Sequence, residues 1–157
     1  MLVPINVLRL VQENYKKIKK DYGTLNVIVS FLVLPVVLAA AFYYNTPPEN
    51  SMRVLKESIN FISIVIGFLI NALVLIIMSM HNQNRYYKKL KEHLSFNIIN
   101  AILVGIFYTL GVLLFYGDRP ILILCFYFLL FHFITLLLNI LRKFGAFIEY
   151  KQKEYKT

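Results

Sequence analysis

Four stretches of the chain, each about 21 residues long, contain no Lys, Arg, Asp or Glu. They are residues 24–44, 59–80, 96–116 and 121–141. An α-helix rises ~1.5 Å per residue, so each stretch reaches ~30 Å, the thickness of the hydrocarbon core of a bilayer. Apolar residues surround each predicted helix instead of forming the single stripe of a soluble bundle. The sequence therefore predicts an all-α integral membrane protein with four transmembrane helices.

The composition of the chain agrees with this prediction. Hydrophobic residues make up 59% of the sequence and charged residues 16%, below the ~25% usual in soluble domains. The first span is too long for a cleaved signal peptide, so we expect it to remain in the membrane. The single cysteine, Cys125, falls inside the fourth span. No soluble domain is expected in the chain.

Positively charged residues are distributed unevenly between the two sides that the spans define. Of the 17 Lys and Arg residues, 14 lie before the first span, between the second and third, or after the fourth, and three lie in the other loops. Loops that stay in the cytoplasm are enriched in Lys and Arg. We therefore expect both termini and residues 81–93 to be cytoplasmic, and residues 45–58 and 117–120 to lie outside.

Two segments outside the spans have patterns of their own. Residues 1–23 place apolar and basic side chains on opposite sides of a helix, which predicts an amphipathic helix at the inner interface of the membrane. Such a helix can be a simple anchor or a moving gate, and the sequence leaves both open. Residues 142–157 form a basic cytoplasmic tail, so the predicted domains are 1–23, 24–141 and 142–157.

Neutral polar and small side chains recur at helical spacing inside three of the spans. The predicted faces are Asn60, Ser63, Gly67 and Asn71 in the second span; Asn97, Ala101, Gly105 and Tyr108 in the third; and Cys125, His132, Thr135, Asn139 and Arg142 in the fourth. Amide and imidazole groups are costly in hydrocarbon without hydrogen bonds, so these faces should point to protein or water. They either hold the helices of one bundle together or line a pore between subunits.

Two further residues bear on the interior of the membrane. Pro35 lacks the N–H that would bond to the carbonyl of Phe31, so it predicts a kink in the first span. His132 lies near mid-membrane, where a neutral imidazole needs a hydrogen-bond partner and protonation is costly. We expect a structural hydrogen bond from His132 rather than a pH sensor.

Several functional classes are disfavoured by what the sequence lacks. No span contains a carboxylate or a cation at depth, which proton- and cation-coupled small transporters need. There is no nucleophile–base pair in a plausible site and no glycine-rich phosphate loop, so we do not expect an enzyme. His81 and His93 lack companion ligands at metal spacing, and neither a metal nor another cofactor is expected.

The loop between the second and third spans is the candidate for ligand recognition. It contains the cations and tyrosines Arg85, Tyr86, Tyr87, Lys88, Lys89 and Lys91. Cations can hold phosphates and tyrosines can stack on bases, so a nucleotide or oligonucleotide is a candidate ligand. The alternative is that these residues only fix the loop on the cytoplasmic side. In a homo-oligomer, which we take as a tetramer, several copies would form a basic ring.

A resemblance to a known family rests on the chain layout and on residues 59–93. The segment INFISIVIGFLINALVLIIM, followed by the basic, tyrosine-containing loop, resembles the small membrane effectors of bacterial anti-phage systems, in particular the Hailong type. The resemblance implies an oligomeric pore of the bacterial inner membrane, paired with a nucleotidyltransferase and held closed by a cytoplasmic oligonucleotide. A membrane interaction or assembly subunit and a small flippase for lipid-linked substrates are the alternatives.

Overall fold

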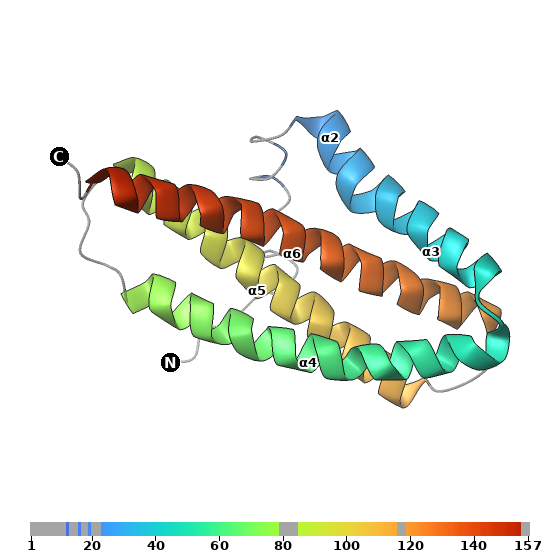
Figure 1. Cartoon of the computed structure of the whole chain (residues 1–157). Coiled ribbons are helices and arrows are strands. Elements are labelled where there is room, and N and C mark those ends of the chain that lie inside the picture. Colours follow the sequence, from blue (N-terminus) through green and yellow to red (C-terminus); the bar gives the residue numbers. More distant parts are fainter. Residues whose placement is uncertain are drawn as a thin grey trace.

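The structure, a computed structural model, is built of helices (Figure 1). It describes residues 23–78, 85–115 and 119–154, together with Gln12, Lys16 and Lys19. The elements in chain order are α2 (Thr24–Ile28), the π-helical turn η1 (Val29–Val33), α3 (Leu34–Asn45), α4 (Pro48–Met78), α5 (Arg85–Leu114) and α6 (Pro120–Glu154). The described part of the chain contains no strand.

Four helical segments are long and apolar enough to cross a membrane. They are Thr24–Asn45, Asn50–Met78, Lys88–Leu114 and Pro120–Ile148. The prediction of an all-α, multi-pass membrane protein with four transmembrane helices is confirmed at this level. Most of the predicted amphipathic helix over residues 1–23 lies outside the described residues. Of residues 1–22, the structure describes Gln12, Lys16 and Lys19, which are helical and exposed.

The first span departs from a regular α-helix where the sequence predicts it. The π-helical turn η1 separates α2 from α3, and Pro35 occupies the beginning of α3. A proline has no N–H to continue the ladder of hydrogen bonds, and proline and π-helical turns are both known causes of kinks in helices. The first span is therefore made of two α-helical pieces joined by a wider turn.

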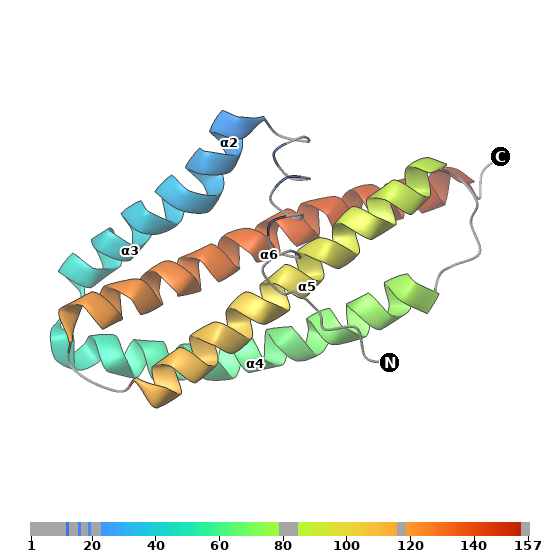
Figure 2. The same cartoon turned by 180° about the vertical axis from the view of Figure 1, so that it is seen from behind.

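The four spans form an open row rather than a closed bundle (Figure 2). Helix α5 packs on both α4 and α6, and α6 packs on α5 and α3. Short connections predict that consecutive spans are neighbours. Within the described residues, however, α3 packs on α6 and has no substantial contact with α4. The first two spans thus lie at the two ends of the row, and a large part of each is exposed.

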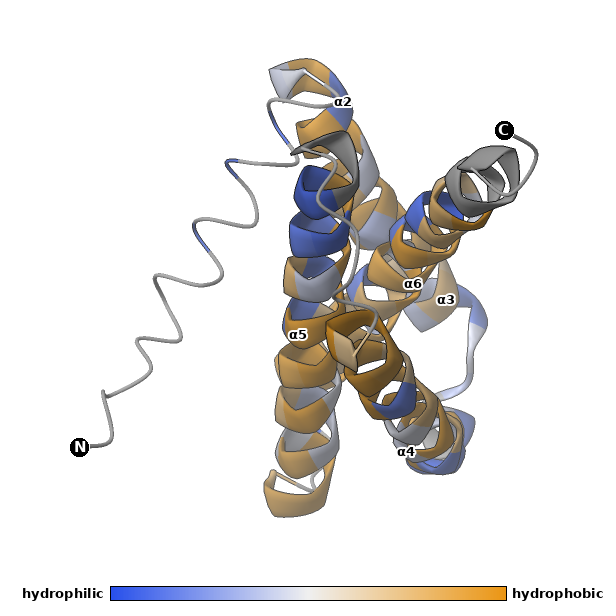
Figure 3. Cartoon of the chain, turned by 90° about the vertical axis from the view of Figure 1, so that its left-hand side faces the viewer, coloured by the Kyte–Doolittle hydropathy of each residue, from blue (hydrophilic) through white to orange (hydrophobic). Residues whose placement is uncertain are grey.

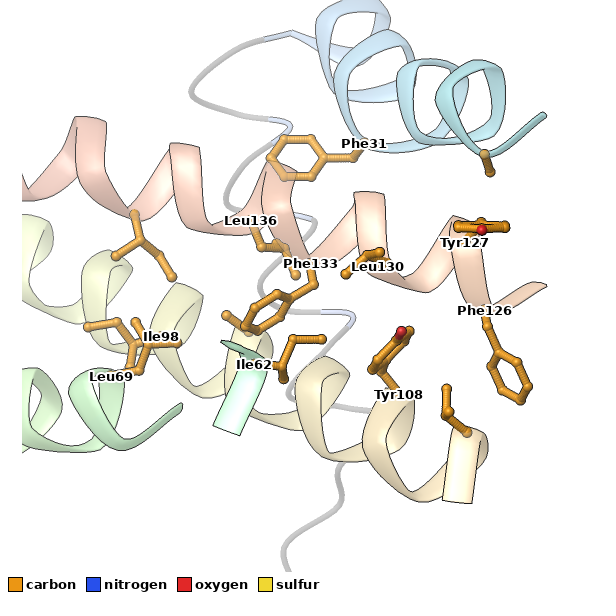
Figure 4. Close-up of a cluster of buried hydrophobic side chains, with 14 of the residues drawn as sticks. Phe31, Ile62, Leu69, Ile98, Tyr108, Phe126, Tyr127, Leu130, Phe133 and Leu136 are labelled. Carbon is orange, nitrogen blue, oxygen red and sulfur yellow. The ribbon is translucent and has the colours of Figure 1, made fainter. Parts of the chain in front are cut away.

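The core lies where α4, α5 and α6 meet (Figure 4). Every seventh residue of α4, from Leu55 through Ile62 and Leu69 to Ile76, is buried. Phe133 of α6 is fully buried in the same cluster, together with Ile98 and Tyr108 of α5. A seven-residue repeat is typical of helices that pack along a nearly parallel seam.

Three helices extend well beyond the hydrophobic spans read from the sequence. Helix α4 begins at Pro48, ahead of the uncharged stretch at 59–80, and α5 begins at Arg85, ahead of the stretch at 96–116. Residues 85–93, most of the predicted loop, are therefore helical. Helix α6 continues to Glu154, so its described part includes most of the predicted tail. Lys143 and Phe147 of that segment are buried, so α6 keeps packing beyond the uncharged stretch that ends at residue 141.

Candidate oligomer interface and ligand-binding residues

The polar residues of α4 form one exposed line, which we call the α4 stripe. Its members are Asn60, Ser63, Gly67 and Asn71, and all four are exposed. A side chain added at Gly67 would meet no atom within 4 Å. At 3.6 residues per turn, the stripe lies roughly opposite the buried seam of Leu55 and Ile62. The interpretation that this stripe holds helices of one chain together is therefore wrong for α4.

A second exposed strip on α4 has the opposite character. Phe61, Phe68 and Leu75 are 52%, 70% and 68% exposed, and they lie beside the α4 stripe on the same helix. Large apolar side chains on the surface of a membrane helix are suited to contact with lipid. Helix α4 thus presents three surfaces, which are a buried seam, an apolar strip and the α4 stripe.

The polar face of α5 is buried, in contrast to that of α4. Asn97, Ala101 and Tyr108 are fully buried, and a Cβ at Gly105 would lie 2.9 Å from Ile66 Cδ1 and 3.0 Å from Phe133 Cε2. This face brings α5 close to α4 and α6. The predicted face of α5 thus lies inside the bundle, with Ala101, Gly105 and Tyr108 at the contacts between helices.

Tyr108 links α5 to α4 through two hydrogen bonds. Its hydroxyl donates to the Leu55 carbonyl at 3.0 Å and lies 2.5 Å from Ser58 Oγ. The Ser58 hydroxyl also reaches the Leu55 carbonyl, at 2.7 Å. A tyrosine carries its hydroxyl at the end of a large apolar ring, so it can pack in the core and still bond to backbone. Sequence reasoning did not identify Ser58 as the partner of Tyr108.

His132 of α6 makes the structural hydrogen bond that its position predicts. Its Nδ1 lies 2.9 Å from the carbonyl oxygen of Phe31 and donates to it. In a regular α-helix the N–H of residue 35 would donate to this carbonyl, but Pro35 has no N–H. The imidazole therefore ties α6 to the irregular turn of the first span, and its ring stacks on Phe128.

The other members of the predicted α6 face have different surroundings. Thr135 donates to the Phe131 carbonyl at 2.9 Å within its own helix, Asn139 is buried, and Cys125 and Arg142 are exposed. A hollow of about 260 Å³ lies between α6 and the first span. Its polar lining consists of Asn26, Ser30, Thr135, Asn139 and Arg142. The structure thus gathers polar groups of the first and fourth spans at one place.

The predicted basic ligand-binding residues lie at the beginning of α5, where Figure 3 shows hydrophilic residues ahead of the apolar part of the helix. Lys88 and Lys89 are exposed. Lys91 is only half-exposed, and its Nζ donates to the Ile77 carbonyl at 3.2 Å. A cation at the carbonyl end of a helix stabilises it, so Lys91 caps α4. The side chains of Arg85, Tyr86 and Tyr87 lie outside the described set.

Two buried asparagines of α5 carry amides with no hydrogen-bond partner among the described residues. Both amide atoms of Asn97 and both of Asn100 are in this state. Asn100 follows Asn97 by one helical turn, a spacing that could have marked it in the sequence. No group of three His, Cys, Asp or Glu side chains that could hold a metal ion occurs within the described ranges.

Comparisons with protein-family models, with curated proteins and with solved structures find no match to this chain. The functional argument therefore rests on the membrane spans, the α4 stripe and the basic start of α5.

Proposed function

We propose that the protein is a non-enzymatic, homo-oligomeric membrane pore that acts as an effector in the bacterial inner membrane. The observation that carries this proposal is the exposed α4 stripe. Asn60 and Asn71 place amides on the surface of a span that the rest of the chain leaves uncovered. Such groups need hydrogen-bond partners or water at membrane depth, which other copies of the chain or a water-filled lumen would supply.

The small residues of the α4 stripe favour contact between copies. Ser63 and Gly67 are four residues apart, the spacing of small residues at which membrane helices approach closely. The open space at Gly67 leaves room for a second helix to pack on the α4 stripe. The α4 stripe therefore supports a symmetric assembly in which it lies between subunits or faces the lumen.

A regulatory ligand is the second part of the proposal. Lys88 and Lys89 are exposed near the N-terminal end of α5, and the first turn of that helix carries no acidic residue. Cations and the positive end of a helix dipole both attract anions. We therefore propose that a cytoplasmic nucleotide or oligonucleotide binds these residues, and that a nucleotidyltransferase supplies it. This agrees with the resemblance to Hailong-type effectors.

The first experiment tests the assembly. In a Cys125→Ala background, Ser63→Cys on the α4 stripe should form cross-linked dimers upon oxidation in membranes. Phe68→Cys on the apolar strip of the same helix is the matched control, and it should cross-link much less. Equal cross-linking at both positions, or at neither, would contradict the proposed interface.

The second experiment tests the pore. Expression without its proposed partner should depolarise the membrane, as read with a potential-sensitive dye, and the purified protein should carry current in bilayers. Gly67→Leu should reduce both effects while Phe68→Leu should not. An intact potential together with no current would exclude a pore. In that case the α4 stripe would instead favour the second candidate, a subunit that binds another membrane protein through the same face.

A further inference from the structure

A larger hollow of about 450 Å³ lies on the other side of the first span, away from the α4 stripe. All three neighbouring elements contribute to its wall. The residues that matter here are Ile28 and Phe31 of the first span, Asn100 and Phe107 of α5, and Phe128 and His132 of α6. Its volume falls within the ~300–1,000 Å³ range of pockets that bind small molecules in proteins.

The lining is apolar except for two side chains, His132 and Asn100. The His132 imidazole bonds to the Phe31 carbonyl. Asn100 is only 3% exposed, and neither its Nδ2 nor its Oδ1 has a hydrogen-bond partner in the described part of the chain. An amide buried without a partner is destabilising, by about 1–3 kcal/mol in typical proteins. A group that occupied the hollow could complete the hydrogen bonds of this amide.

The hollow opens toward the membrane. Its rim includes Ile28, Leu32 and Phe107, which are 47%, 53% and 61% exposed and which belong to apolar parts of two spans. Asn100 itself lies four residues inside the third predicted span, ~6 Å along the helix. A molecule that reaches Asn100 must therefore dissolve in the bilayer first.

We propose that this hollow is a binding site for an uncharged, lipid-soluble ligand whose chain or ring carries one hydroxyl or protonated carboxyl group. Such a group both donates and accepts, so it can pair with both atoms of the Asn100 amide once that side chain, whose amide is buried beside the hollow, turns toward it. The chain or ring would lie against Phe107 and Phe128. Asn97 serves as the comparison for Asn100, because it is also buried but lines none of the hollows described above.

The test uses the absence of tryptophan from the sequence. Leu103→Trp, within the wall of the hollow, provides a single fluorescent reporter in the full-length protein. The probe is stearic acid with a nitroxide on its chain, titrated into detergent-solubilised protein in mildly acidic buffer. Phe68→Trp on the apolar strip of α4 reports unspecific quenching by probe dissolved in the micelle. Phe107→Trp, at the rim, is a second reporter that does not fill the hollow.

The proposal requires saturable quenching at the hollow and linear quenching at position 68. The methyl ester of the same probe lacks the donor and should bind several-fold more weakly. Asn100→Leu should abolish this difference between acid and ester, while Asn97→Leu should retain it. Non-saturating quenching at both hollow reporters, or equal binding of acid and ester, would overturn the proposal. Because these readouts need neither assembly nor current, their outcome is independent of the proposed pore.

Discussion

The stripes of α4 and α5 have nearly the same sequence pattern and opposite surroundings. Each spaces polar and small residues three or four apart along a membrane helix. The face of α5 is buried, and a Cβ at Gly105 would meet side chains of both neighbouring helices. The α4 stripe is exposed, with open space at Gly67. A polar stripe in the sequence therefore leaves open whether the same chain covers that face of the helix.

The difference follows from how membrane helices associate. Lipid tails are as apolar as a leucine side chain, so apolar burial gives little preference for one face of a helix over another. Helix α4 packs within the chain through Leu55, Ile62 and Leu69, and its polar face remains available. Helix α5 packs within the chain through its polar face, so that face is not available for contacts with other copies. The comparison predicts that substitutions on α5 affect the fold and that those on α4 affect assembly.

The largest expected effect is that of Gly105→Leu. The added side chain would overlap Ile66, Phe133 and Ile62, since even its Cβ would lie 2.9–3.2 Å from atoms of all three. Overpacking of a core typically costs about 1–3 kcal/mol, and a bulky side chain at a glycine lies at or above the upper end. Unfolding by SDS titration, followed by circular dichroism, should show this loss of stability.

Gly67→Leu is the matched substitution on α4. It should leave the unfolding free energy of the monomer within error of the wild type, because no atom of the described residues lies within 4 Å of a Cβ at this position. Its effect should instead be a lower oligomer fraction in detergent. A destabilised monomer in Gly67→Leu, or an unaffected one in Gly105→Leu, would remove the contrast between the stripes.

Hydropathy along the sequence predicted the number of membrane spans and their approximate positions. Uncharged stretches of about 21 residues mark the membrane spans, but a helix does not end at the membrane surface. Helices α4, α5 and α6 therefore begin or end beyond these stretches, α6 by 13 residues at its C-terminal end (154 − 141). The order of packing was also out of reach, since short loops suggest that α3 and α4 are neighbours and the structure pairs α3 with α6.

The sequence could predict which residues belong to the candidate sites, but not which of them contact one another. Pro35 predicted a carbonyl at Phe31 without a helical partner, and His132 predicted a need for one. Only the structure shows that they meet, at 2.9 Å. The burial of Asn100 and the cap that Lys91 provides likewise depend on which helices lie side by side. Spacing along one helix carries no information about that.

A smaller effect is expected from Tyr108→Phe on the buried face. It removes the hydroxyl that bonds to the Leu55 carbonyl and Ser58 Oγ while retaining the ring. The Leu55 carbonyl still accepts from Ser58, so the loss should be close to that of one ordinary hydrogen bond, about 1 kcal/mol. Ser58→Ala and the double variant complete a thermodynamic cycle in the SDS titration. A coupling energy of zero between them would show that the Tyr108–Ser58 contact contributes nothing.

The smallest and most discriminating effect is that of paired asparagine substitutions. Asn71→Leu on the α4 stripe should remove one hydrogen bond between subunits, worth on average ~0.6 kcal/mol in membranes. That corresponds to about a threefold weaker association for each bond lost. Energy transfer between labelled subunits, measured upon dilution with detergent, resolves a change of this size.

Asn97→Leu is the counterpart on α5, and the sign of its effect should differ. Both atoms of the Asn97 amide are buried without a hydrogen-bond partner among the described residues, so an apolar side chain of similar size removes an unfavourable group. Its unfolding free energy should be unchanged or higher, and association should remain as in the wild type. If Asn71→Leu instead destabilised the monomer and Asn97→Leu dissociated the oligomer, the assignment of the two stripes would be reversed. The surface for assembly would then have to be sought on α5.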